Sequence, residues 1–183
     1  MCKKCNTKPV YEFTNKKKLC RTCFMKYFQK KVFYIINKFS MLKKGEKFTI
    51  KKSSEFRGAV LQEVLEIYAE RARAQILKKS NKIAVSLTLD NQASETLRIL
   101  IKGKFQELKK VLPTEKKGNK IIIKPLYLFL DEEVLLYAKL KRLKFRKSKE
   151  KKDKFRKFLD EMEKKHPEVK RAVVKSLLDV YKL

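Results

Sequence analysis

The spacing of apolar residues predicts a chain rich in helices. Between residues 24 and 42, apolar side chains recur every three or four positions with lysines between them, which is typical of a basic amphipathic helix. The same spacing predicts further helices over residues 54–78, 91–103, 105–112, 131–140 and a last one that ends at Leu183. Asp90 or Asn91 is expected to cap the helix that begins at residue 91, because their side chains accept hydrogen bonds from first-turn amides.

Short apolar runs between these helices predict strands. The runs are Gly45–Lys52, Lys82–Leu89 and Lys120–Pro125, and the intervening Pro113–Asn119 is expected to be a polar loop. Strands that alternate with helices are typical of a parallel sheet covered by helices. The predicted fold class is therefore α/β, with a small, reduced sheet that a partner would complete.

The balance of charged residues is the most informative feature of the composition. Lys and Arg number 49 against 20 Asp and Glu, a formal net charge of +29, which predicts attraction to a polyanion. Nucleic acid is the first candidate, and an anionic membrane surface is the second.

The basic excess is concentrated in residues 139–157, which hold twelve basic residues and two acids. Such a run can be a solvated face, but its one-sided charge favours a surface that binds phosphate. The candidate nucleic-acid contacts are Lys141, Arg142, Lys144, Arg146, Lys147, Lys151 and Lys152, with Lys26, Lys30 and Lys31 of the first helix as second choices.

Several classes of protein are excluded by the sequence. No apolar run approaches the roughly 18 residues of a membrane span, and we expect no membrane partner. The N-terminus carries no apolar signal core, so a cytoplasmic location is expected. The four glycines are scattered, and no glycine-rich phosphate loop can be built from them.

The four cysteines form a metal-binding motif. Cys2 and Cys5 make one C-x2-C pair and Cys20 and Cys23 make another, separated by fourteen residues that are expected to form a short hairpin. Two such pairs present four thiolates to one tetrahedral ion, so structural zinc is the first prediction. An iron–sulfur cluster uses the same ligands and remains an alternative, as do redox-active pairs.

Four stretches of the sequence carry a family pattern. The first is the cysteine motif with the basic helix behind it, and the second is residues 89–103, LDNQASETLRILIKG. The third is residues 122–138, IIKPLYLFLDEEVLLYA, and the fourth is residues 155–167, FRKFLDEMEKKHP. Together they resemble the tRNA 2-thiolation proteins of the TtuA and cytoplasmic tRNA thiolation family, within the PP-loop ATPase superfamily.

The resemblance implies a zinc ribbon, a linker helix and an α/β domain that uses ATP to replace a uridine oxygen with sulfur. This chain departs from that pattern at the family's ATP-binding motif and at its catalytic cysteines. Where the family has S-G-G-x-D-S, residues 53–58 are SSEFRG, so Ser53, Ser54 and Asp90 would form a vestigial nucleotide site. The family's catalytic cysteines within the domain are missing, and ATP is not an expected cofactor.

The expected organisation is a zinc ribbon over 1–24, a basic linker helix over 25–44, a reduced PP-loop-like domain over 45–145 and basic C-terminal helices over 146–183. It implies a non-catalytic tRNA-binding subunit or accessory factor in uridine 2-thiolation. Its expected partners are tRNA and either an intact PP-loop thiolase or a second copy of the chain. The alternatives are a divergent ATP-dependent thiolation enzyme and a zinc-ribbon RNA-binding protein unrelated to thiolation.

Overall fold

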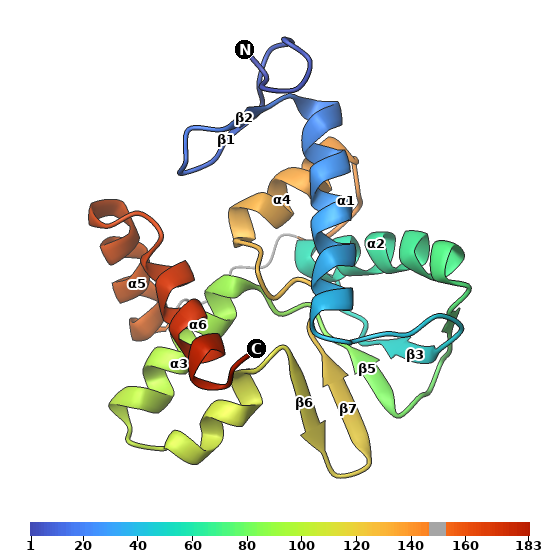
Figure 1. The fold of residues 1–183 in the computed structure, drawn as a ribbon, viewed down its shortest axis with the longest axis vertical. Helices are drawn as coiled ribbons and strands as arrows, with labels where there is room; N and C mark the ends of the chain where they lie inside the picture. Colours follow the sequence, from blue (N-terminus) through green and yellow to red (C-terminus); the bar gives the residue numbers. More distant parts are fainter. Residues whose placement is uncertain (147–152) are drawn as a thin grey trace.

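The computed structural model describes residues 1–146 and 153–183. A two-stranded antiparallel hairpin, β1 (Tyr11–Glu12) and β2 (Lys18–Leu19), precedes the long helix α1 (Arg21–Lys38). The hairpin stands at one end of the molecule and α1 descends from it toward the sheet (Figure 1). The expected hairpin between the cysteine pairs is therefore confirmed.

The sheet of the α/β domain has five strands in the order β4-β3-β5-β7-β6. Its first four strands, β4 (Gln75–Ile76), β3 (Lys47–Ile50), β5 (Lys82–Ala84) and β7 (Lys120–Ile123), are parallel, and β6 (Thr114–Lys117) pairs antiparallel with β7. The expected parallel α/β sheet is confirmed, but the expectation of three strands was wrong. Edge strand β6 lies inside residues 113–119, which were expected to be a loop, because its pairing with β7 determines its conformation.

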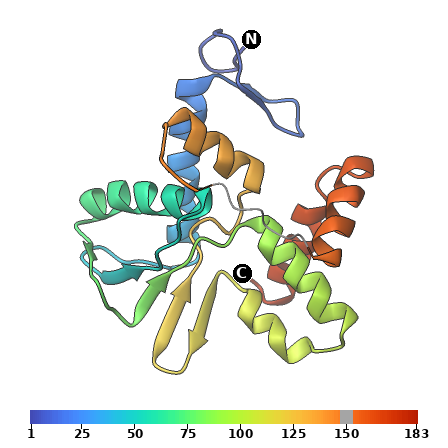
Figure 2. The same cartoon turned by 180° about the vertical axis from the view of Figure 1, so that it is seen from behind.

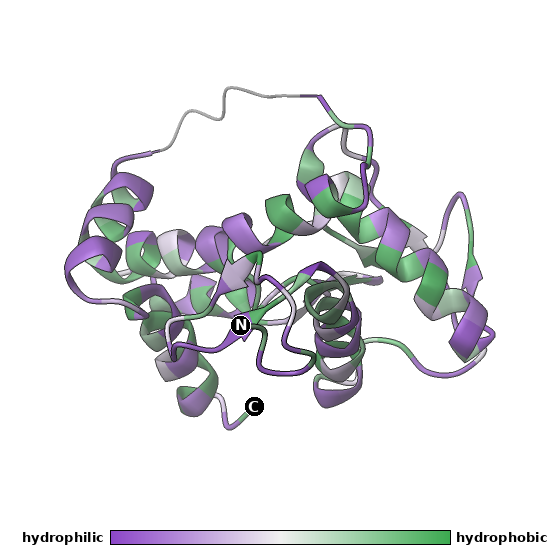
Figure 3. Ribbon diagram, turned by 90° about the horizontal axis from the view of Figure 1, so that it is seen from above, coloured by the Kyte–Doolittle hydropathy of each residue, from purple (hydrophilic) through white to green (hydrophobic). Residues whose placement is uncertain are grey.

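Two groups of helices surround this sheet (Figures 1 and 2). In one group α1 packs with α2 (Phe56–Ala72) and α4 (Asp131–Leu140), and in the other α3 (Leu89–Ile101) packs with α5 (Lys154–Lys165) and α6 (Val169–Val180). A 3₁₀ helix, η1 (Phe105–Val111), follows α3. Figure 3 shows apolar and polar residues mixed along these helices, as expected when one face of a helix is buried and the other is solvated.

The main core joins the hairpin end, the first helix group and the sheet. Phe28 of α1 stacks on Tyr137 of α4, with ring centroids 4.3 Å apart, and lies 4.2 Å from the ring of Phe129. Phe28, Phe129 and Tyr137 are fully buried. Burial of each such side chain contributes about 1.5–3 kcal/mol, so α1 is fixed to the domain rather than held as a flexible tether.

Two predicted helix starts differ from the structure. Thr88 is the N-cap of α3, and its backbone amide donates to Asn91 Oδ1 at 3.0 Å, so neither Asp90 nor Asn91 occupies the cap position. The helix expected over residues 54–78 is α2, which begins at Phe56 with Glu55 as its N-cap and ends at Ala72. Among the described residues, no helix is long and apolar enough to cross a bilayer.

Candidate metal centre and strand-end site

The four cysteines meet at the base of the hairpin. Cys20 is the N-cap of α1 and Cys23 lies in its first turn, whereas Cys2 and Cys5 come from the loop before β1. All four Sγ atoms lie within 4.8 Å of one another, and Cys5 Sγ is 3.3 Å from Cys20 Sγ and 3.6 Å from Cys23 Sγ. The expected four-cysteine metal-binding group is therefore present.

Local hydrogen bonds prepare some of these thiols for deprotonation. The Lys4 amide donates to Cys2 Sγ at 3.5 Å and lowers the pKa of that thiol. Hydrogen bonding from the Thr7 side chain, followed by the Cys23 backbone amide, lowers the pKa of Cys20 to about 6. The adjacent Cys5 sulfur raises the pKa of Cys23 to about 12. Four thiolates at one point repel each other, so a cation is needed to hold them all deprotonated.

The hairpin also reaches across to the α/β domain. Tyr11 donates its hydroxyl hydrogen to Glu132 Oε1 of α4 at 2.7 Å, and its ring packs against Phe13 and Phe24. Beyond this contact, a cavity of about 810 Å³ opens between the hairpin and helices α4, α5 and α6. Asp90, Asp131, Arg156 and Lys170 are among its lining residues.

The crevice where the vestigial nucleotide site was expected lies at the carboxyl ends of β3 and β5. The chain turns outward to β4 after β3 and returns to β5 on the other side, and open α/β sheets bind ligands at such a switch point. Ser53 and Ser54 lie here, exposed, beside a cavity of about 410 Å³. Asp90 lines the larger cavity instead, so the structure does not bring the three predicted residues into one pocket.

The SSEFRG loop has a different architecture from a phosphate-binding loop. Gly58 packs so closely on the loop that a Cβ atom there would lie 2.5 Å from Ser53 O. Arg57 is buried rather than directed at the crevice, and its guanidinium reaches Glu55 and Asp131. The backbone amide of Arg146 donates to Ser54 O at 2.8 Å, so the segment after α4 lies against the loop.

Asp90 is buried and fully engaged with other parts of the chain. Lys170 Nζ donates to its Oδ1 at 2.7 Å, and Arg156 Nη2 lies 3.4 Å from the same oxygen. Its Oδ2 accepts a hydrogen bond from the Asp131 amide at 2.6 Å. Both carboxylate oxygens of Asp90 are therefore engaged by other residues of the chain, although Asp90 lines the larger cavity.

Asp131 belongs to the same group of buried ion pairs, and it was not predicted as a site residue from the sequence. Its carboxylate accepts from Arg57 Nε at 2.7 Å, from Thr88 Oγ1 at 2.6 Å and from Arg156 Nη2. Burial alone would raise the pKa of Asp131, but hydrogen bonding and charge from Arg57, with Thr88 and Arg156, lower it to about 2. In the sequence, position 131 was only the first residue of a predicted helix. We call Arg57, Asp90, Asp131, Arg156 and Lys170 the ion-pair cluster.

Lys124 supports the neighbouring part of the domain. It follows β7 and is 1% exposed, and its ammonium donates to Lys110 O at 2.5 Å and Leu112 O at 2.8 Å. Burial lowers the pKa of Lys124 to about 8, against weaker opposing charge from Glu115 and Glu95. The lysine thus holds the end of η1 against the sheet.

The candidate nucleic-acid contacts fall into three groups. Lys26, Lys30, Arg142, Lys144 and Arg146 are exposed, as expected for phosphate contacts. Lys147, Lys151 and Lys152 lie outside the described residues. Lys31 and Lys141 are paired with acids of the chain itself, at 3.7 Å from Glu133 and 2.7 Å from Glu63 respectively. Burial lowers the pKa of Lys31 to about 8, which makes it a weaker candidate than its exposed neighbours.

Comparison with known proteins shows a likeness to solved structures. No protein-family model matches the sequence, and no curated protein matches it. Among solved structures, the fold is similar to that of the U34-tRNA thiolase NcsA from Methanococcus maripaludis, which was solved with its [4Fe-4S] cluster. The TM-score is 0.80 at 19% sequence identity, and the match covers 99% of this chain and 87% of that chain. This likeness shows the fold.

Proposed function

We propose that this protein is a non-catalytic, metal-containing tRNA-binding subunit or accessory factor in tRNA uridine 2-thiolation. Its fold is similar to that of a U34-tRNA thiolase, and its basic charge suits a tRNA partner. An intact PP-loop thiolase would supply the ATP chemistry and the sulfur. The observation that carries the proposal is the ion-pair cluster at the site where a catalytic relative would need open ligand positions.

The ion-pair cluster and the loop at residues 53–58 each argue against ATP use. Magnesium in phosphoryl-transfer sites is held by carboxylate oxygens and by the nucleotide's phosphates. Asp90 and Asp131 instead direct their oxygens to Arg57, Arg156 and Lys170. Phosphate groups also need close approach to backbone amides, which glycines permit. The loop replaces those glycines with Ser54 and Glu55, and Glu55 brings a negative charge.

We further propose that the four cysteines hold one zinc ion. Four sulfurs at about 2.3 Å from one tetrahedral ion lie about 3.8 Å apart. The observed separations of 3.3 Å and 3.6 Å around Cys5 fit that arrangement. A four-iron cluster binds each thiolate through a different iron and needs them further apart. With four protein ligands the ion has no open position, so its role is to fold the ribbon.

The first test uses the purified, metal-loaded chain with magnesium, ATP and tRNA. We expect no tRNA-dependent release of AMP and pyrophosphate, and addition of a PP-loop thiolase from the same cells should restore thiolation. Turnover by the chain alone would replace this proposal with a divergent thiolation enzyme. Elemental analysis of the same sample should give zinc rather than iron and sulfide.

A pull-down from native cells tests the partners. Recovery of tRNA together with an intact PP-loop thiolase supports the accessory role. Recovery of mixed RNA without a thiolase would contradict it and favour a zinc-ribbon RNA-binding protein. Recovery of further copies of this chain as the sole protein partner would point to a homo-oligomer and against the thiolase pairing.

A further inference from the structure

We infer that a groove beside the edge strand β6 binds single-stranded RNA. This inference rests on the proposed function. It places an RNA-binding surface outside the basic run at residues 139–157. The groove has a volume of about 610 Å³ and lies between η1, β6 and the end of the chain after α6. Figures 1 and 2 both show the C-terminus beside β6.

The charge of this edge groove is strongly one-sided. Its lining includes four exposed lysines, Lys109 and Lys110 from η1 and Lys116 and Lys117 from β6. Its single acid is the half-buried Glu115. Lys110 lies 3.3 Å from Glu107, but an exposed pair of this kind contributes little and leaves the ammonium available to a phosphate. The groove therefore favours a polyanion.

An aromatic side chain distinguishes the groove from an ordinary basic surface. Tyr181, directly after α6, is half-buried and lines the groove. Its ring packs against a small apolar cluster formed by Ile99, Val111 and Leu177, so the ring is held in place before any ligand arrives. Bases stack on such fixed aromatic rings, and lysines beside them contact the sugar–phosphate backbone.

The shape favours a single strand over a duplex. A cavity of about 610 Å³ is of a size that encloses one small ligand unit, such as a nucleotide. The phosphates of a duplex could contact the rim lysines, but its bases are already paired and stacked on one another, so they are not available to stack on Tyr181. The loops and ends of an RNA present unstacked bases that can. The expected occupant is thus an unpaired segment of tRNA.

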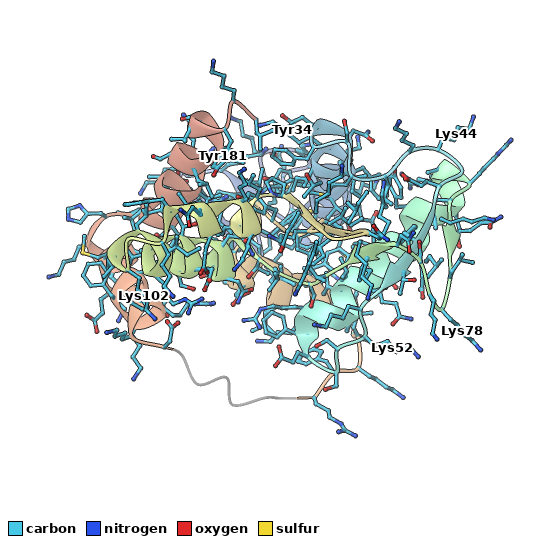
Figure 4. The ribbon with its side chains drawn as sticks, turned by 90° about the horizontal axis from the view of Figure 1, so that it is seen from below. Tyr34, Lys44, Lys52, Lys78, Lys102 and Tyr181 are labelled. Carbon is cyan, nitrogen blue, oxygen red and sulfur yellow. The ribbon has the colours of Figure 1, made fainter. Side chains whose placement is uncertain are left out.

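The test measures binding of a fluorescent uridine octamer and of tRNA to the full, metal-loaded chain over a range of salt. The variant K116Q/K117Q removes two groove charges. The matched control K78Q/K79Q removes two exposed lysines, and Lys78 lies on the opposite side of the molecule from Tyr181 (Figure 4). We expect the groove variant to lower the log–log salt slope for the octamer by about 1.4. The control should leave the slope unchanged.

Two further variants test the ring itself. Tyr181→Leu keeps apolar packing but removes the stacking surface, and it should weaken octamer binding about tenfold. Tyr181→Phe keeps the ring and should bind as the parent chain does. Far-UV circular dichroism establishes that each variant is folded. A photo-cross-link from the octamer should map to Tyr181 or its neighbours in the groove.

The outcomes separate this inference from the proposed function. Equal effects of the groove variant and the control would overturn the groove, whatever the pull-down recovers. Binding to anionic vesicles is measured with the same variants. If K116Q/K117Q lost vesicle binding while its RNA binding stayed unchanged, the groove would contact a membrane and not RNA, which would also overturn the inference. Groove-dependent octamer binding without any associated thiolase would instead leave the groove standing and contradict the role in thiolation.

Discussion

Arg57 of α2 and Asp131 of α4 form a two-point ion pair, with Nε donating to Oδ1 at 2.7 Å and Nη2 to Oδ2 at 2.5 Å. The pair joins the two helices next to the crevice at the ends of β3 and β5. The Arg57 side chain is 6% exposed and the Asp131 side chain is 17% exposed. Because Arg156 donates to the same carboxylate, this pair also connects α5 to the domain.

Asp131→Asn should destabilise the fold strongly. The asparagine would keep the shape of the side chain but remove the negative charge. The buried guanidinium groups of Arg57 and Arg156 would then lack the carboxylate that they share. Loss of one partner of a buried ion pair costs about 3–5 kcal/mol. Urea unfolding followed by circular dichroism measures the change. Glu66→Gln, an exposed change on α2, is the control and should lie within about 0.5 kcal/mol of the parent.

The same carboxylate should make stability depend on pH in the acid range. The pKa of Asp131 is lowered in the folded chain from the ordinary 3.8 to about 2. A depressed carboxyl pKa stabilises the fold above the unfolded value, and this contribution is lost as pH falls from about 4 to about 2. The loss should amount to about 2 kcal/mol.

Urea titrations of the parent chain and Asp131→Asn between pH 2 and pH 6 measure this contribution. The difference between their free energies of unfolding should shrink steadily as pH falls. A difference that stays constant over this range would show that the Asp131 carboxyl does not titrate with the expected pKa.

The sequence predicted the elements that have a strong local signal. The cysteine spacing predicted the hairpin and the metal group, and apolar periodicity predicted α1 and α4. Strand β4 was missed because its two residues fell within the helix predicted over 54–78, and β6 was missed because it has little apolar character. Thr114–Lys117 is polar throughout, and it becomes a strand through its pairing with β7 rather than through its own propensity.

The ion-pair cluster could not be predicted from spacing along the chain. Its members at positions 57, 90, 131, 156 and 170 come from five different helices. Arg156 stood within a basic run that predicted a solvated or phosphate-binding face, yet it is 7% exposed. Tertiary packing, which brings α5 and α6 against α3, decides the role of such a side chain. The Asp131 signal was limited to its place at a helix start.

Gly58→Ala should be destabilising, although the same change in most helices is favourable. Alanine is normally the better helix former by about 1 kcal/mol. At position 58 the added Cβ would lie 2.5 Å from Ser53 O and 2.7 Å from Ser53 Cβ, so the loop would have to move. Overpacking of this kind costs about 1–3 kcal/mol. A higher midpoint in urea unfolding would show that the loop yields easily and does not constrain α2.

Lys124→Met should reveal the cost of a buried ammonium through its pH dependence. Burial lowers the pKa of Lys124 to about 8 from the ordinary 10.5. Between these values the unfolded chain binds more protons than the folded chain, so this group makes stability rise with pH. The methionine variant lacks that rise, but it leaves Lys110 O and Leu112 O without their donor.

The comparison is made by urea unfolding at pH 7.5, 9 and 10.5. We expect the stability of the parent chain to increase relative to Lys124→Met as pH rises through this range. Lys78→Met, an exposed change, controls for general alkaline effects and should show no such relative gain. If the parent chain instead loses stability relative to Lys124→Met with rising pH, the charged ammonium is favoured in the fold. The hydrogen bonds from the Lys124 ammonium to the two carbonyls would then contribute more free energy than its burial costs.

Cys20→Ser tests whether the metal centre and the α/β domain fold separately. The substitution removes one of four ligands next to α1, and a structural zinc site loses its folding free energy when a ligand is lost. Elemental analysis should show the bound metal falling from about one ion per chain to a small fraction of it. The hairpin should then detach from α4, which breaks the hydrogen bond from Tyr11 to Glu132.

The α/β domain should still unfold cooperatively in Cys20→Ser. The core around Phe28 and Tyr137 lies further along α1 and is fully buried, so it does not depend on the metal. Loss of that transition together with the metal would show that the ribbon and the domain form one folding unit.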